Sequence, residues 1–473
     1  MSMRKLYLKA LLFLCVIGGF IFIMDRVGIF KPDQSNFHEK RRWDSFYEFT
    51  KSNDVDVLLI GNSHLYTGIN PNHLSCVLGA NCFILAAPGT AIPDSYFTLK
   101  EGLTRCDPKV VVVETYGIKS SDIRKYTGGG LTLEFRSFYS RKNLIQKLLS
   151  TPFLFSPDNY LMAWSESVRG HDILFKDPKL VKKNLSGKNT YPKRRGMDLG
   201  RFTTYTKGIT EESDRQYDEK GPVVDGDSFR VNRESYDYVK KIEALCDKKG
   251  IKLVFLTLPM YYKHVKNYSS WHTIVSRVIG NGYHHLDLQD PYDMELFTRD
   301  CFQNTRNVNQ HMTAHGAFVA DYKLADFLLD KAKVDLPDRS KSRDWRMMFY
   351  GEKGYFEHYT QEPGDTSSFM LCKDVDLGGV KVMDSVFIPG EDSGWIYMRL
   401  DKKSDLSRIS GGMDMYLMVT LSDGSKERYK THLSMDPGIS PRGHYLLSTP
   451  YSGISGINSV QLETIVLLSN KDQ

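Results

Sequence analysis

The sequence is sparing in cysteine, and its cysteines lack a metal-binding spacing. Seven cysteines occur among 473 residues, and no two of them form a Cys-x-x-Cys pair. This pattern excludes the common zinc ribbons and a thioredoxin-like redox motif. Scattered buried thiols are the favoured interpretation, while a Cys76–Cys82 disulfide stays open for a domain outside the cytosol.

The chain also lacks an excess of charge of either sign. Lys and Arg number 63 and Asp and Glu number 57, which gives a net charge of +6. This charge is small for the length, and no helix-turn-helix or aromatic RNA-binding pattern accompanies it, so nucleic acid is not an expected partner. Neither an internal repeat nor a low-complexity tract is evident.

One long apolar run is present, near the N-terminus. Residues 10–24 carry no charge and follow Arg4, Lys5 and Lys9. With residues 6–8 included, the run approaches the length of a membrane span. Because no small-x-small site follows Met24, residues 1–35 predict an uncleaved anchor and linker rather than a cleaved signal peptide. A short tail before a long domain places that domain outside the cytoplasm, in the periplasm or at the cell surface, tethered to the cytoplasmic membrane.

Residues 36–335 alternate between apolar strands and amphipathic helices. Each strand is a continuous apolar run, which is typical of a mostly parallel sheet covered on both faces. The sequence therefore predicts a three-layer α/β/α domain. Its expected strands are 55–60, 81–85, 110–113, 251–258 and 283–288, and its expected helices are 70–78, 94–104, 234–249, 272–279 and 314–331.

Two further regions interrupt or follow this pattern. Residues 118–232 form a long insertion, for which a lid over the active edge and a solvated loop region are both open. Its basic run, 193–195, suits either an acidic glycan or a solvated surface. After a polar linker at 336–342, residues 343–473 change to a period of two, as at 413–422, which predicts an all-β sandwich or jelly roll.

The chemistry centres on the end of the first strand. The run 55–60 stops at Gly61-Asn62-Ser63-His64, and ligands of open α/β sheets bind just beyond the carboxyl ends of strands. Ser63 is therefore a candidate nucleophile, with a simple turn serine as the alternative. His64 either lines the pocket or caps the turn.

A serine nucleophile needs a base within hydrogen-bond reach. The best candidate is His311, which precedes the last helix in the run His-Met-Thr-Ala-His-Gly-Ala. His315 lies four residues later, but Met312 replaces the Glu of a His-Glu-x-x-His motif, so neither a metal nor another cofactor is expected.

Three short motifs resemble the SGNH/GDSL hydrolase superfamily over residues 36–333. They are Gly-Asn-Ser-His after the first strand, a Pro-Gly turn after the second, and the His311 run before the last helix. The narrower resemblance is to its membrane-anchored branch linked to acylation of envelope polymers, such as the teichoic-acid D-alanyl transfer and alginate O-acetylation proteins. Leu65 excludes the Gly-x-Ser-x-Gly elbow of α/β-hydrolases.

The resemblance implies Ser63 as nucleophile, His311 as base and Gly89 as an oxyanion donor. Two departures follow from it. Val308 stands where the family has an Asp, which leaves Asn307 or Asn309 to orient the imidazole. The family's third-block Asn is also missing, which leaves Thr115 or Tyr116 as donors.

These features together predict a membrane-tethered serine enzyme that works through an acyl-Ser63 intermediate. The expected reaction is O-acyl transfer to an envelope or exported polysaccharide, with a multi-pass membrane protein supplying the acyl group. A carbohydrate O-acetyl esterase is one alternative. A non-catalytic glycan-binding or scaffold protein is the other, and the C-terminal domain would then serve as a carbohydrate-binding or docking module.

Overall fold

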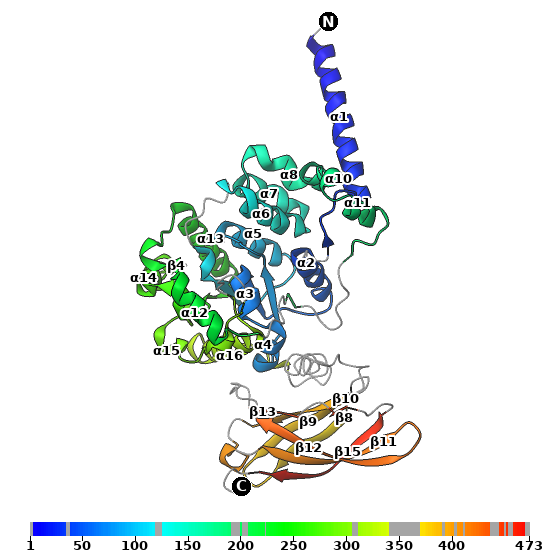
Figure 1. Cartoon of the computed structure of the whole chain (residues 1–473), viewed down its shortest axis with the longest axis vertical. Helices are drawn as coiled ribbons and strands as arrows, with labels where there is room; N and C mark the ends of the chain where they lie inside the picture. Colours follow the sequence, from blue (N-terminus) through cyan, green and yellow to red (C-terminus); the bar gives the residue numbers. More distant parts are fainter. Residues whose placement is uncertain are drawn as a thin grey trace.

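The computed structural model places three parts: an N-terminal helix, an α/β domain and a C-terminal β domain (Figure 1). It describes residues 3–34, 38–118, 125–190, 199–200, 207–222, 224–304, 311–339, 369–389, 393–401, 404–409, 412–435, 444–448, 451–452 and 457–468.

The N-terminal helix α1 (Met3–Val27) projects from one end of the α/β domain (Figure 1). It is long and apolar enough to cross a membrane, since 25 residues span about 38 Å. Its base is fixed by Asp25, whose carboxylate accepts hydrogen bonds from the hydroxyls of Ser165 and Ser167 and from the backbone N–H of Ser167. The helix is thus compatible with the expected anchor, and a signal sequence would satisfy the same criteria.

The central sheet is parallel throughout and, within the described residues, has five strands in the order β2-β1-β3-β5-β7. Alternate residues of each strand face opposite layers. In β1, Leu58 and Ile60 join the core formed with α2, α5 and α13, while Val57 and Leu59 join the core formed with α4 and α16. The predicted three-layer α/β/α architecture is therefore confirmed. The strands are β1 (Val57–Gly61), β2 (Cys82–Ala86), β3 (Val110–Glu114), β5 (Lys252–Thr257) and β7 (His284–Asp287).

The helices around the sheet lie close to their expected positions. Two helices differ from the expectation. Helix α14 begins at Tyr268 rather than at residue 272, and the last helix ends at Asp326 and continues as a π-helical turn, Phe327–Lys331. No disulfide joins the cysteines of the described segments. The helices are α2 (His38–Phe49), α3 (Ser63–Gly68), α4 (Pro71–Leu78), α5 (Ile92–Gly102), α13 (Arg233–Lys249), α14 (Tyr268–Ile279), α15 (Pro291–Met294) and α16 (Ala314–Asp326).

The long insertion is largely helical where it is described. Its helices α6 and α7 pack against α2 and α5 and gather at the end of the domain from which α1 projects (Figure 1). The basic run 193–195 lies outside the described residues, and a lid role for the insertion stays a prediction. The helices are α6 (Gly128–Ser140), α7 (Leu144–Leu154), α8 (Tyr160–Trp164), α9 (Glu166–Gly170), α10 (Ile173–Lys176), α11 (Pro178–Leu185) and α12 (Glu211–Lys220).

The C-terminal region is an antiparallel sheet, as the period of two predicts. In its described part the order is β15-β11-β12-β13-β10-β9-β8, with β14 paired to β10, and the terminal strands β15 and β8 contact each other. Met413, Met415, Leu417 and Val419 of β11 all point into its core. The strands are β8 (Phe369–Asp376), β9 (Lys381–Pro389), β10 (Ser393–Leu400), β11 (Met413–Leu421), β12 (Lys426–Met435), β13 (His444–Ser448), β14 (Tyr451–Ser452) and β15 (Ile457–Leu467).

A buried pair joins α4 to α16 and gives a test of the fold. Asp321 Oδ2 lies 2.9 Å from His73 Nδ1, both side chains are at most 1% exposed, and burial raises the pKa of Asp321. Asp321→Ala strands the buried imidazole, and we expect it to lower the free energy of unfolding by about 3 kcal/mol, measured by denaturant titration. Asp293→Ala is the control. It removes a partly exposed ion pair with Lys323, which lies in α16 as Asp321 does, and should lower the free energy of unfolding by less than about 1 kcal/mol. Equal losses would contradict the assignment.

Candidate active site

Ser63 opens a helix at the carboxyl edge of the sheet rather than occupying a free turn. Asn62 caps α3, and its side-chain oxygen accepts a hydrogen bond of 2.9 Å from the backbone N–H of His64. The Thr67 hydroxyl donates to the Ser63 carbonyl at 2.8 Å. Such capping satisfies the exposed donors of a helix start and fixes the position of Ser63, whose side chain is neither fully buried nor fully exposed.

Gly61 is required just before this helix. A Cβ at that position would lie 2.7 Å from the Cβ of Glu114 at the end of β3. That separation is too short for two carbon atoms, so a side chain would push the ends of β1 and β3 apart. Gly61 therefore serves the close approach of two strand ends next to Ser63.

Tyr66 lies one turn after Ser63 and contacts it directly. Its hydroxyl is hydrogen-bonded to the Ser63 side chain, and burial raises the pKa of Tyr66 to about 12, so the phenol stays protonated at neutral pH. The guanidinium of Arg42, from α2, lies 4.8 Å from the centre of the Tyr66 ring. Arg42 is itself buried and donates to the carbonyls of Gly200 and Ala86. A guanidinium is thus held against the Tyr66 ring.

The structure brings the predicted residues His64, Tyr116 and His311 together at the helix that begins with Ser63. The His64 ring stacks on Tyr116 with centroids 3.9 Å apart and rings 17° from parallel. The His311 ring meets the His64 ring edge-on, with centroids 5.9 Å apart. Because His64 is only 2% exposed, it packs between the loop after β3 and the loop before α16. The role of His64 in lining the site stays a prediction.

Burial keeps His311 and His264 neutral. It lowers the pKa of His311 below its ordinary value. Burial and, to a lesser extent, the proximity of His311 lower the pKa of His264 to about 4. Burial in a low-dielectric environment disfavours the imidazolium form. Both imidazoles are consequently free bases at neutral pH, which is the state that a general base requires.

Gly89 and Thr115 lie at the carboxyl ends of the strands that flank β1. Gly89 is exposed in the loop after β2 and has a φ of +66°, which favours glycine. Thr115 is fully buried, and its hydroxyl lies 2.6 Å from that of Thr257. The oxyanion roles of Gly89, Thr115 and Tyr116 stay predictions. Asn307, Val308 and Asn309 lie outside the described residues.

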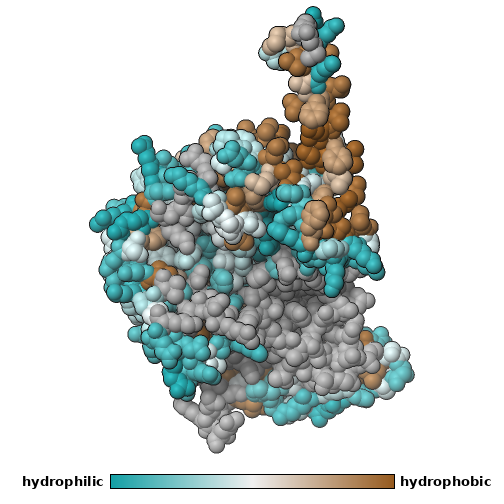
Figure 2. Space-filling model, turned by 45° about the horizontal axis from the view of Figure 1, so that its top comes forward, coloured by the Kyte–Doolittle hydropathy of each residue, from teal (hydrophilic) through white to brown (hydrophobic). Residues whose placement is uncertain are grey.

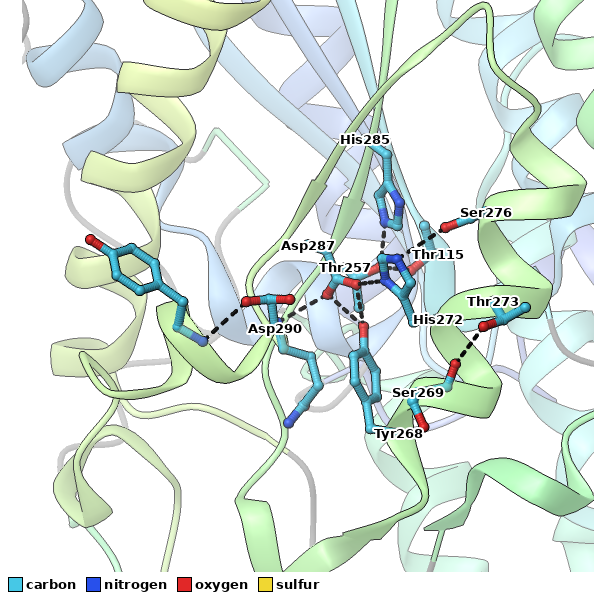
Figure 3. A network of polar contacts seen from close by, with 12 residues as sticks. Thr115, Thr257, Tyr268, Ser269, His272, Thr273, Ser276, His285, Asp287 and Asp290 are labelled. Atoms are coloured by element: carbon cyan, nitrogen blue, oxygen red, sulfur yellow. Dashed lines mark hydrogen bonds and ion pairs between the residues drawn. The ribbon is translucent and has the colours of Figure 1, made fainter.

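A polar network extends from Thr115 along the same sheet edge (Figure 3). The Thr257 hydroxyl lies 2.8 Å from Nε2 of His285. Asp287, at the end of β7, accepts from the Tyr268 hydroxyl and pairs with Nδ1 of His272, each at 2.5 Å. Burial next to Asp287 raises the pKa of Tyr268, and burial lowers that of His285 to about 4. The network braces the ends of β3, β5 and β7.

Sequence reasoning missed His264, Tyr66 and the His272–Asp287 pair. Asp287 carried a usable signal, because it is a carboxylate at the end of an expected strand. His264 carried none, since it follows the strand end by several residues in an irregular segment, η6 (Tyr262–His264). His284 packs against Phe327, away from His285, as strand alternation predicts.

One group of described residues has ligand atoms close enough to hold a metal ion. Asp300, Cys301 and His315 place one such atom each within 4.8 Å of the others. Burial raises the pKa of the Cys301 thiol to about 11, and a protonated thiol is a poor ligand. His315 is more than half exposed and lies 3.5 Å from Asp300. His315 therefore belongs to the helix surface.

Comparison with known proteins leaves the identity of the chain open. No family model matches it, and no curated protein does. Among solved structures, a two-domain esterase (CEX) active on acetylated mannans, co-crystallised with mannopentaose, matches at 10% identity with a TM-score of 0.27. The match covers 91% of this chain and 95% of that one. A similarity at this level carries no argument about function, which therefore rests on the geometry around Ser63.

Proposed function

We propose that the chain is a membrane-tethered serine enzyme that cleaves or transfers acyl esters on a polysaccharide. The observation that carries this proposal is the meeting of the Ser63 helix start with a neutral, buried His311 across the His64 ring. Ser63 lies near the start of the domain's sequence and His311 lies near its end. Serine hydrolases typically take their nucleophile and their base from segments that are distant in the sequence.

In the proposed reaction, the Ser63 hydroxyl oxygen attacks the acyl carbonyl carbon while His311 accepts the hydroxyl proton. The tetrahedral intermediate then collapses, the ester C–O bond breaks, and His311 returns the proton to the departing alkoxide. This leaves an acyl-Ser63 ester. His311 next accepts the proton of an incoming hydroxyl, whose oxygen attacks the ester carbonyl. The acyl C–O bond to Ser63 then breaks, and His311 returns the proton to the Ser63 oxygen.

The acid of the usual triad has no assigned counterpart, so the proposal relies on a Ser–His dyad. Asp287, the carboxylate at the end of β7, pairs with His272 and Tyr268. In place of a carboxylate, the His64 ring would orient the His311 imidazole, because His64 stacks on Tyr116 and meets the His311 ring edge-on. The buried Arg42, behind Tyr66, contributes a positive potential that favours negative charge developing near Ser63.

The acceptor decides the reaction. A sugar hydroxyl makes the protein an O-acyltransferase, for which a multi-pass membrane protein would supply the acyl group, and water makes it an esterase. The location at a membrane rests on α1, and the polysaccharide rests on the resemblance of the motifs. The C-terminal antiparallel domain would then bind glycan.

A non-catalytic glycan-binding or scaffold protein is the second candidate. One contact favours it: the Tyr66 hydroxyl is hydrogen-bonded to the Ser63 side chain, which suits a structural serine. Val308 at the family's Asp position points the same way. The neutral state of His311 favours the enzyme.

Turnover of an activated acetyl ester by the full chain in detergent separates these candidates. If the chain is an enzyme, it should release the alcohol of the ester catalytically and then release acetate. Adding an oligosaccharide then distinguishes the two reactions, because a transferase diverts the acetyl group to the sugar and an esterase does not. Release no faster than that of the Ser63→Ala variant would support the non-catalytic candidate.

A further inference from the structure

Helix α7 has its amphipathic faces reversed. Lys147, Ser150 and Thr151 are buried together with Leu154, while the aliphatic residues Leu144, Ile145, Leu148 and Leu149 are exposed. The Lys147 ammonium lies 4.9 Å from the Phe138 ring and 5.4 Å from the Trp164 ring, and burial lowers the pKa of Lys147 to about 8. Amphipathic helices of water-soluble proteins turn their apolar face to the core. The outer face of α7 is therefore suited to an apolar environment.

The neighbouring helices extend this face. Large apolar side chains on α7, α8, α10 and α11 are between 43% and 86% exposed. Single exposed apolar residues are common on protein surfaces, but a contiguous group marks a binding surface. Figure 2 shows hydrophobic side chains gathered near the base of the N-terminal helix. We call this group the α7 face: Leu144, Ile145, Leu148, Leu149, Phe153, Leu161, Leu174, Phe175 and Leu185.

The α7 face lies where α1 leaves the domain. The hydrogen bonds from Ser165 and Ser167 to Asp25 hold the base of α1 against α9. The helices α7, α8, α10 and α11 occupy the same end of the domain (Figure 1). A bilayer crossed by α1 would meet these helices first.

Charge at the edge of the face complements a lipid surface. Lys176, Lys179, Lys182 and Lys188 of α10, α11 and the residues after them are exposed. Apolar side chains next to lysines are the composition of helices that lie in the headgroup region, where basic residues are attracted to anionic lipids.

We propose that the α7 face is embedded in the membrane leaflet that α1 enters. The proposal rests on the membrane tether of the proposed function and adds a second contact. The lipid surface then covers the apolar side chains and fixes the α/β domain against the bilayer. A membrane protein seated on the face is the alternative outcome.

The test uses the full chain in vesicles that contain brominated phosphatidylcholine, which quenches tryptophan at membrane depth. Leu148→Trp probes the α7 face, and Ile145→Trp repeats the test at a second exposed position. Tyr292→Trp, on the exposed part of α15, is the matched control, and Leu12→Trp reports on α1. The signal of the five native tryptophans is subtracted by using the unsubstituted chain.

We expect brominated lipid to reduce the added fluorescence about twofold or more at positions 148, 145 and 12, and to leave position 292 unchanged. Quenching at 12 without quenching at 148 and 145 overturns the proposal while the tether stands, and assigns the α7 face to a protein partner. The absence of quenching at all three positions overturns both the tether and the face.

Discussion

Replacing Ser63 by alanine is expected to lower kcat/KM for acyl-ester cleavage by at least about 10³-fold. The substitution removes the oxygen that attacks the carbonyl but leaves the Asn62 cap of α3 intact, because that cap acts on the backbone of His64. The fold should therefore survive. Initial rates with an activated ester measure the loss of activity, and circular dichroism of each variant shows whether the fold survives.

Ser269→Ala is the matched control for Ser63→Ala. Ser269 is an exposed serine in the first turn of α14, so its loss should change the rate by less than about twofold. If Ser63→Ala retained the rate of the unsubstituted chain, a different group would be the nucleophile, and the proposed mechanism would be wrong.

His311→Gln is expected to lower kcat by about 10²- to 10⁴-fold, the usual contribution of a general base. Glutamine keeps part of the volume and a hydrogen-bonding group but accepts no proton at neutral pH. His315→Gln, four residues away and more than half exposed, is the control. Because Ser63 and His311 act as one unit, the double variant should be hardly slower than Ser63→Ala. A product of the two single effects would place them in separate steps.

The lowered pKa of His311 predicts the pH dependence. Burial disfavours the imidazolium, so the base stays neutral at pH 7, and the rate should fall only below the ordinary histidine range near ~6.5. The pKa of His311 is lower in the folded chain than in the unfolded chain. The neutral imidazole therefore contributes stability at pH values above the unfolded-state pKa, and this contribution is lost as the pH falls. His264 adds to the same loss. Circular dichroism at each pH distinguishes titration of the base from acid unfolding.

A rate that declines with the midpoint of an unburied histidine, while the fold stays intact, would contradict the buried position of the base. The same profile in His311→Gln would show that another group controls the acid limb. His264→Asn then becomes the informative variant, because His264 also carries a pKa lowered by burial.

The strands of the α/β domain could be predicted because their apolar runs are continuous and end at polar turns. Residues 57–60 and 110–113 illustrate this, since each run is entirely apolar and fully buried. The β11 strand was equally clear, because Met413 to Leu421 alternate between core and surface. Helix starts were less certain: α14 begins at Tyr268, after an Asn267 with a positive φ that no periodicity reveals.

Ser63 and His311 could be proposed from the sequence because short motifs mark both. The contacts that surround them could not, because they join distant segments. Arg42 reaches Tyr66 from α2, and His264 lies in the short helical turn η6 after β5. The insertion gave no sign of its helical packing, since α7 buries polar residues and exposes apolar ones, the reverse of the pattern that sequence reasoning assumes.

The most direct test of the central claim is the covalent intermediate. The full chain is mixed briefly with an isotopically labelled activated acetyl ester, quenched in acid, digested and examined by mass spectrometry. The mechanism predicts a labelled acetyl group on Ser63, which is absent from Ser63→Ala and accumulates much more slowly in His311→Gln. Turnover without a label on Ser63, or a label that persists elsewhere in Ser63→Ala at the same rate, would contradict it.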